Sequence, residues 1–205
     1  MKVYPGVMLA ALIVLASTPG FTQPSGSGSG QISGQISVSG SRGQTRSGTY
    51  SGSVQRKHTP GQGGQQTHRG QITGAGGRTV GIDGASTTTT GDQGWQRHSS
   101  HHISGPQGTP LYHSECFSQG QRDSASRSCQ TTVREEIYNT SSTITRTGPT
   151  TVDRQTTLSQ DGQEIGGSQT TVTHSRHEGS FTKTVRGQTT SGKPINRTVR
   201  LTPNR

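Results

Sequence analysis

Histidines gather in the middle of the chain at spacings that could bind a metal ion. His98, His101 and His102 lie within one short segment, and His113 follows a little further on. Neutral imidazole nitrogens are common ligands of Zn(II), Cu(II) and Ni(II). Two interpretations fit these residues: a metal-binding or pH-responsive cluster, or a set of polar side chains brought together by composition alone.

The two cysteines of the chain, Cys116 and Cys129, flank a short polar segment. Cysteines of an exported protein usually pair, because the compartments outside the cytosol are oxidising. Closing a loop of this length would stabilise the folded state by roughly 3 kcal/mol. We therefore expect an internal disulfide. The alternatives are a metal half-site formed by Cys116 with His113, and cross-links between chains.

Basic residues dominate the first part of the chain, where no acidic residue precedes Asp83. The whole sequence has 20 Lys and Arg against 10 Asp and Glu, a net charge of +10. Such a chain attracts acidic glycans, lipopolysaccharide or anionic lipid, although a solvated, self-repelling coil would have the same composition. The candidate polyanion-binding residues are Arg42, Arg46, Arg56, Lys57, Arg69 and Arg78.

Other sequence motifs with chemical meaning are weak. The segment from Gly187 to Lys193 matches the start of a phosphate-binding loop, but Pro194 stands where such a loop needs Ser or Thr. Carboxylates are scattered, and no nucleophile motif is found. The sequence thus predicts a non-enzymatic protein without a cofactor. Aromatic residues make up 4% of the chain, too few to stack on bases, so no nucleic-acid partner is expected.

The chain begins like a secretory signal peptide. Lys2 supplies a positive charge, and an apolar run from Val7 to Ala16 precedes small residues. This run is too short for a membrane-spanning helix, which needs about 20 residues. We expect residues 1–20 to form a short signal helix that is removed. No transmembrane segment is expected after it, so the protein should be secreted, or lie in the periplasm or at the cell surface if it is bacterial.

Composition predicts little ordered structure in the first half of the chain. Hydrophobic residues make up 22% of the sequence, and there are 31 glycines. Ordering a residue costs roughly 1–2 kcal/mol of backbone entropy, which apolar burial must offset. We therefore expect residues 21–110 to be a disordered, low-complexity region and residues 111–130 to be a cysteine loop. Recurring Gln-Ile-Ser and Gln-Ile-Thr units in the first region could support weak self-association.

The last part of the chain, residues 131–205, is Thr-rich and predicts β structure. Val or Ile alternates there with polar residues, a pattern typical of half-buried strands. Asp161-Gly162 is a strong signal for a type I′ hairpin turn. We expect a weakly all-β meander or hairpins with one thin apolar face. The candidate strands are 131–138, 142–147, 150–158, 169–176, 180–186 and 195–202.

This Thr-rich texture resembles secreted Thr/Gly/Arg-rich low-complexity proteins of bacteria. The resemblance lies in the segments from Thr143 to Pro149 and from Phe181 to Arg186, and it implies an uncharacterised exported protein. The first functional hypothesis is a structural or adhesive component of an envelope, matrix or secreted layer that binds anionic polymers, lipids or itself. The second is a metal-binding or pH-responsive protein that uses the histidine cluster.

Overall fold

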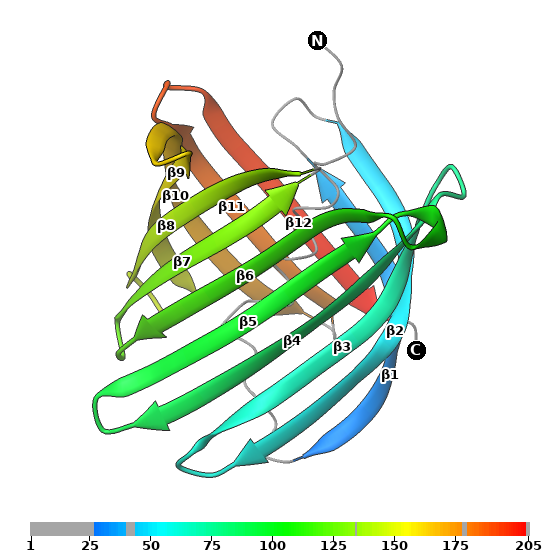
Figure 1. The fold of residues 1–205 in the computed structure, drawn as a ribbon, viewed down its shortest axis with the longest axis horizontal. Helices are drawn as coiled ribbons and strands as arrows, with labels where there is room; N and C mark the ends of the chain where they lie inside the picture. The colour runs from blue at the N-terminus through cyan, green and yellow to red at the C-terminus, as the bar shows by residue number, and fades with distance from the viewer. Residues whose placement is uncertain (1–26, 40–43, 134, 178–179, 204–205) are drawn as a thin grey trace.

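The chain forms a closed barrel of antiparallel strands in the computed structural model (Figure 1). The structure describes residues 27–39, 44–133, 135–177 and 180–203. None of the helical structure in these residues is long and apolar enough to cross a membrane. The strands are β1 (Gly28–Ser39), β2 (Thr45–Thr59), β3 (Gly63–Gly74), β4 (Thr79–Gly91), β5 (Gly94–Ser104), β6 (Pro110–Gly120), β7 (Ser124–Val133), β8 (Glu136–Arg146), β9 (Thr151–Gln160), β10 (Gln163–His177), β11 (Ser180–Thr189) and β12 (Pro194–Pro203), and a short 3-10 turn, η1 (Pro106–Gly108), precedes β6.

Each strand pairs with the next one along the chain, and β12 returns to pair with β1. In this closing ladder Ile36 lies opposite Leu201, and Val38 lies opposite Val199. Over the six residue pairs of this ladder, closure covers the backbone N–H and C=O groups that an open sheet would leave at its edges, a common cause of aggregation. The ladder therefore satisfies the backbone of a chain that has few apolar side chains.

Side chains alternate between the inside and the outside of the barrel along every strand, as the pleat requires. In β1, Gly34, Ile36 and Val38 are buried, whereas Gln35 between them is exposed. The same alternation continues through β2 and β3, where glycines and apolar residues face inward together with arginines and histidines, and most outward residues carry hydroxyl or amide groups. The low-complexity composition thus conceals a period of two residues.

The apolar part of the interior lies where the two ends of the barrel wall meet. Its buried cluster is Ile36, Val38, Ile72, Phe181 and Val199, and Tyr50, Val80, Ile82 and Leu201 pack against it. These residues come from β1–β4 and from β11 and β12. Burying a side chain of the Val, Ile or Phe type contributes roughly 1.5–3 kcal/mol, so this cluster holds the closing strands together.

A pair of facing glycines lies where two neighbouring strands approach each other closely. Gly52 on β2 lies opposite Gly70 on β3. A Cβ atom added at Gly52 would lie 2.5 Å from the carbonyl oxygen of Arg69 and 2.7 Å from the Cα atom of Gly70. Both distances are far below van der Waals contact. Glycine at these positions therefore allows the backbones of β2 and β3 to approach closely.

The expectation of a mostly disordered chain with a weakly all-β last third is wrong. The described part of the region 21–110, which was expected to be disordered, comprises residues 27–39 and 44–110 and contains strands β1 to β5 and the start of β6. The expectation counted apolar side chains as the chief source of stability and took no account of a closed hydrogen-bond ladder. The predicted signal helix at residues 1–20 lies outside the described residues.

Several local predictions for the second half of the chain agree with the structure. The predicted strands 169–176, 180–186 and 195–202 fall within β10, β11 and β12, and the predicted strand 150–158 overlaps β9 but begins one residue before it. Asp161 and Gly162 connect β9 to β10 and have positive φ angles of 51° and 77°, as a type I′ turn requires. Cys116 and Cys129 form the expected disulfide and lie opposite each other on β6 and β7.

Removing the disulfide should destabilise the barrel without dissolving it, because the neighbouring ladders still set the register of β6 and β7. We expect the double variant Cys116→Ser/Cys129→Ser to lose roughly 3 kcal/mol of unfolding free energy, measured by urea denaturation. Its far-UV circular dichroism should keep the β spectrum. Reductant should lower the stability of the wild type to that of the variant and leave the variant unchanged. A coil spectrum for either reduced protein would contradict the fold.

Candidate anion site in the barrel interior

Several cationic side chains point into the barrel from strands of its second half. Arg154 on β9 alternates with the outward residues Asp153 and Gln155, and Lys183 on β11 lies opposite the buried Val199. Lys183 is 6% exposed. Together with Arg97 on β5, the inward cations described on these strands are Arg127, Arg154, Lys183 and Arg197, which come from β7, β9, β11 and β12.

These cations interact across the interior and not only between neighbouring strands. The pKa of Lys183 is lowered to about 7, first by burial and then by the charges of Arg154, Arg127 and Arg197. Arg127 lies on β7, which pairs with β6 and β8 and not with β11. The pKa of Arg127 is itself lowered to about 10, mainly by burial and next by Arg154. The interior therefore concentrates positive charge around Lys183.

Neutral acceptors orient the arginines. Arg154 donates from Nε and Nη2 to the Ser142 hydroxyl oxygen, at 3.2 and 2.9 Å, and Arg97 donates to the Ser86 hydroxyl oxygen at 2.9 Å. The hydroxyl group of Ser142 also lies 3.0 Å from that of Thr156. Such contacts hold a guanidinium group in place but do not neutralise its charge.

Arg127 has a different set of acceptors, the sulfur atoms of the disulfide. Its Nη2 atom lies 3.0 Å from the Cys116 sulfur, and its Nε atom lies 3.2 Å from the Cys129 sulfur. The disulfide therefore does more than link β6 to β7. Its two sulfur atoms also accept hydrogen bonds from the Arg127 side chain and so orient that side chain on the inner wall.

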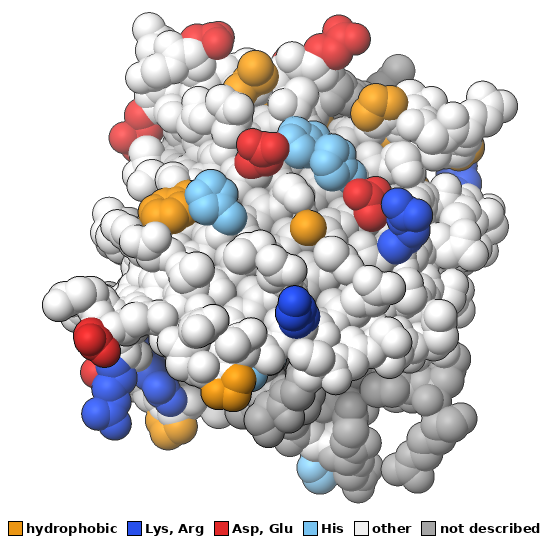
Figure 2. All heavy atoms as spheres, turned by 60° about the horizontal axis from the view of Figure 1, so that its bottom comes forward, with side chains coloured by type: hydrophobic (Ala, Val, Ile, Leu, Met, Phe, Trp, Pro, Cys, Tyr) orange, Lys and Arg blue, Asp and Glu red, His pale blue; other side chains and the backbone are white. Residues whose placement is uncertain are grey.

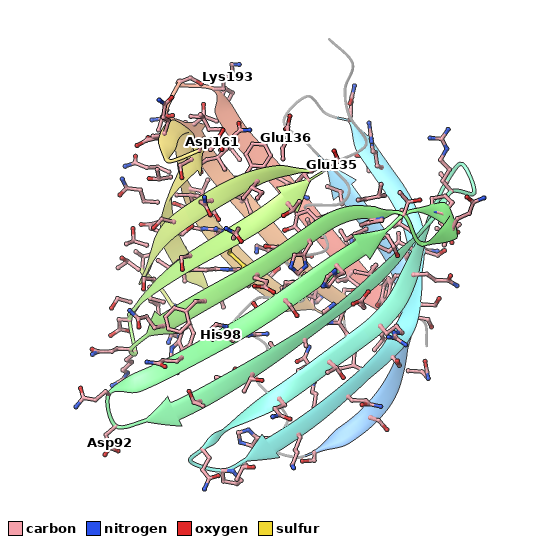
Figure 3. All side chains as sticks on the ribbon, in the orientation of Figure 1. Asp92, His98, Glu135, Glu136, Asp161 and Lys193 are labelled. Atoms are coloured by element: carbon pink, nitrogen blue, oxygen red, sulfur yellow. A yellow bond between two sulfur atoms is a disulfide. The ribbon has the colours of Figure 1, made fainter. Side chains whose placement is uncertain are left out.

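The carboxylates that the structure describes lie away from these cations. Asp83 is half-buried and lies opposite Arg69 on neighbouring strands, and every other described carboxylate residue is exposed. Figure 3 shows Asp92, Glu135 and Asp161 at turns at the two ends of the barrel. Because a buried charge needs a partner of opposite sign, the interior around Arg154 and Lys183 is suited to an added anion.

The predicted polyanion-binding residues are divided between the two sides of the wall. Arg46 and Arg56 follow the inward parity of Tyr50 on β2, whereas Lys57 is exposed on the same strand. Arg69 is exposed on β3. Arg78 lies in the turn before β4, and Arg42 is outside the described residues. The structure therefore does not gather these six predicted residues into one surface.

The predicted histidine cluster is divided as well. His101 points inward and is 2% exposed, and its pKa is lowered to about 3, mainly by burial and next by His68. His98 and His102 point outward from the same strand, as alternation requires. His98 lies beside Phe117, with ring centres 5.2 Å apart, whereas His102 lies beside His113.

The outer wall is polar throughout the part that Figure 2 shows, with scattered charged, histidine and hydrophobic side chains. At outward positions, serine and threonine also face each other across neighbouring strands, as in the pairs Ser128–Ser141 and Thr173–Thr184. An open groove of about 680 Å³ runs along this wall and extends over strands β4 to β9. It is lined by small polar residues together with His98, Glu115 and Phe117.

The inward cations could not be recognised from the sequence, because the sequence alone does not show which face of a strand points into the barrel. The signal was nevertheless present in the parity of the residues. Arg127 stands two residues before Cys129, and Arg197 stands two residues before Val199. In a strand, each of these pairs shares one face. Cations that share the face of a disulfide or of a core valine are candidates for an interior site.

Comparison with known protein families, with curated proteins and with solved structures returns no match for this chain. The interior cations, their neutral acceptors and the exposed positions of the carboxylates are therefore the observations on which a functional interpretation rests.

The titration of Lys183 gives a test of the interior charge. An ordinary lysine has a pKa of 10.5, and that of Lys183 is about 7 in the folded protein. Between these values the unfolded chain binds a proton that the folded chain has released, so the free energy of unfolding should rise with pH. Each pKa unit corresponds to about 1.4 kcal/mol. Below pH 7 Lys183 is protonated in both forms, so its contribution to the slope should vanish.

Urea denaturation between pH 6 and 10.5 measures this effect. We expect Lys183→Met to lose the rise in unfolding free energy that Lys183 contributes above pH 7. At pH 6 to 7 the variant should be more stable than the wild type, because it does not bury a charged lysine. Lys193→Met, in the exposed turn after β11, is the matched control and should keep the wild-type slope. Equal slopes for the wild type and Lys183→Met would show that Lys183 is not buried among cations.

Proposed function

We propose that this protein is a non-enzymatic, exported binding protein whose barrel holds an anionic group, such as a phosphate, sulfate or carboxylate. The observation that carries the proposal is the burial of Arg154 and Lys183 together in the interior, where the charge of Arg154 lowers the pKa of Lys183 and the Ser142 hydroxyl group orients the Arg154 guanidinium group. Buried cations are costly without a partner of opposite charge. An anion that enters the barrel would therefore be bound by groups that are already desolvated and oriented.

The chemistry of the interior favours binding over catalysis. Arginines stay protonated and act as fixed hydrogen-bond donors, with a planar fork that matches carboxylate and phosphate oxygens. Lys183 adds a charge that depends on protonation, because its pKa is about 7. A bound anion would favour the protonated form, so binding should be accompanied by proton uptake and should weaken above neutral pH.

Export is part of the proposal and has two supports. The leader at residues 1–20 has the pattern of a secretory signal peptide. The disulfide between Cys116 and Cys129 is compatible with an extracellular or periplasmic location, since such bonds persist in oxidising compartments. In an envelope or secreted layer, the anionic group could belong to a free ion or to a substituent of a polymer. If the anionic group is a substituent of a polymer, the protein would have the adhesive role that the composition suggested.

Anion binding can be tested with pyrophosphate and with dextran sulfate as the free and the polymeric probe. Isothermal titration calorimetry at pH 6.5 should show saturable binding of at least one of them. Arg154→Gln and Lys183→Met should each weaken that binding at least tenfold, although both variants should unfold at a higher temperature than the wild type when no anion is present. Loss of binding together with a gain in stability is the result that a merely structural role would not produce.

Matched controls lie on the outer wall. Lys57→Met and Arg69→Gln remove the same charges from exposed positions of β2 and β3. They should leave pyrophosphate binding unchanged and reduce only the non-specific, salt-sensitive attraction of dextran sulfate. If the outer variants lose binding as much as the inner ones, or if the inner variants bind both probes as well as the wild type, the interior site is ruled out.

A further inference from the structure

The second part of the histidine cluster forms a compact group on the outer wall of the barrel. His102 on β5 and His113 on β6 are direct cross-strand partners. Their ring centres are 4.1 Å apart, with an angle of 35° between the ring planes. Directly opposed residues of an antiparallel pair have Cβ atoms about 4.5–5.5 Å apart, so the two strands hold these imidazoles side by side.

A carboxylate completes this group. Glu115 follows His113 by two residues, and therefore shares the outward face of β6. Its Oε1 atom lies 3.5 Å from Nε2 of His113. Ligand atoms around a tetrahedral Zn(II) ion, each about 2.0–2.1 Å from the metal, lie about 3.3 Å apart. The separation between the imidazole nitrogen and the carboxylate oxygen is thus close to that of two ligands of one ion.

The nitrogen atoms of His113 have different surroundings. Nδ1 is buried and has no hydrogen-bond partner in the described structure, whereas Nε2 faces Glu115. A neutral imidazole that carries its proton on Nδ1 would direct the Nε2 lone pair toward a carboxylate oxygen. With the proton on Nε2 instead, His113 would donate to the Glu115 carboxylate, and a divalent ion bound at Nε2 would take the place of that proton.

The side chains need a small adjustment to enclose an ion. In the part of the chain that the structure describes, no three His, Cys, Asp or Glu side chains converge on one point in their present rotamers. The side chain of Glu115 is 71% exposed and that of His113 is 35% exposed. The strand register places the backbones of His102 and His113 opposite each other, and all three side chains rotate to bring their donor atoms around one ion.

We propose that His102, His113 and Glu115 form a site for a divalent transition-metal ion on the outer wall, with imidazole nitrogens as the principal ligands. Two imidazoles and one carboxylate are a ligand set that Zn(II), Cu(II) and Ni(II) accept, with further positions left to water. The ion links β5 to β6 from the outside. The site is independent of the interior cations, which lie on the opposite face of the wall.

The histidines of the wider cluster have other environments. His98 is on the same outward face of β5 as His102, but its ring lies against Phe117. His101 points into the barrel beside His68, with ring centres 5.6 Å apart. The metal site thus uses two of the clustered histidines, and Glu115 takes the place of the others.

The experiment is a calorimetric titration of the full mature protein with Zn(II), Cu(II) and Ni(II), each as the metal alone, in a buffer that does not bind metals. We expect one saturable site for at least one of these ions. His102→Ala and His113→Ala should each weaken binding at least tenfold, and Glu115→Gln should weaken it less. His98→Ala is the matched control, because it removes an exposed imidazole from the same strand and face.

A second readout reports on where the ion sits. The metal should raise the thermal unfolding midpoint of the wild type and of His98→Ala, since a ligand that binds the folded state stabilises it. The increase should disappear in His102→Ala/His113→Ala and after addition of a chelator. Equal loss of affinity in His98→Ala, or unchanged binding in the double variant, would overturn the assignment.

Discussion

The hydrogen-bond ladder between β1 and β12 is the constraint on which the rest of the structure depends. It joins the first described strand to the last, from the pair Gly34–Pro203 to the pair Ser39–Thr198. An open sheet of this sequence would have two polar edges and no interior. Once the ladder closes, each strand acquires an inner and an outer face, and the inward arginines and Lys183 are withdrawn from water.

Closure also places a stabilising apolar region and a destabilising basic region in the same interior. The apolar cluster around Ile36, Phe181 and Val199 stabilises the barrel where its ends meet. The basic part around Arg154 and Lys183 destabilises it, because burial and mutual repulsion lower the pKa of Lys183. Strain of this kind persists at functional sites when the rest of the fold offsets it. An anion bound in the interior would reduce the repulsion among the buried cations. The outer wall, by contrast, presents hydroxyl groups and the His102–His113 pair to solvent.

Whether a feature of the fold could be predicted from the sequence depends on how far apart along the chain its interacting residues lie. The Asp161-Gly162 turn and the strands that flank it are local, and their residue types predict them. The disulfide was also predictable from the presence of two cysteines. The pairing of β1 with β12 joins distant parts of the chain, so no local pattern announces it. Glycines such as Gly52, which occupy inward positions, hide the alternation that would have revealed strands in the first half.

A shift of parity accounts for one error in the second half. The expected strand 131–138 contains a turn, because Val133 at the end of β7 pairs with Glu136 at the start of β8. The turn reverses the chain, so that Val133 points inward whereas Ile137, which lies opposite Thr132, points outward and is 48% exposed. A single misplaced turn thus moves a side chain to the other face of the wall. The inward cations were missed for a related reason, since their role depends on which face is the interior.

The central claim is that the barrel interior attracts anions, and the most direct measurement is a crystal structure of the protein soaked in iodide, with iodide located by its anomalous scattering. The account predicts ordered iodide inside a closed barrel, within contact of Arg154 and Lys183. Iodide bound only on the outer wall, with the interior cations paired to carboxylates of the chain, would contradict it.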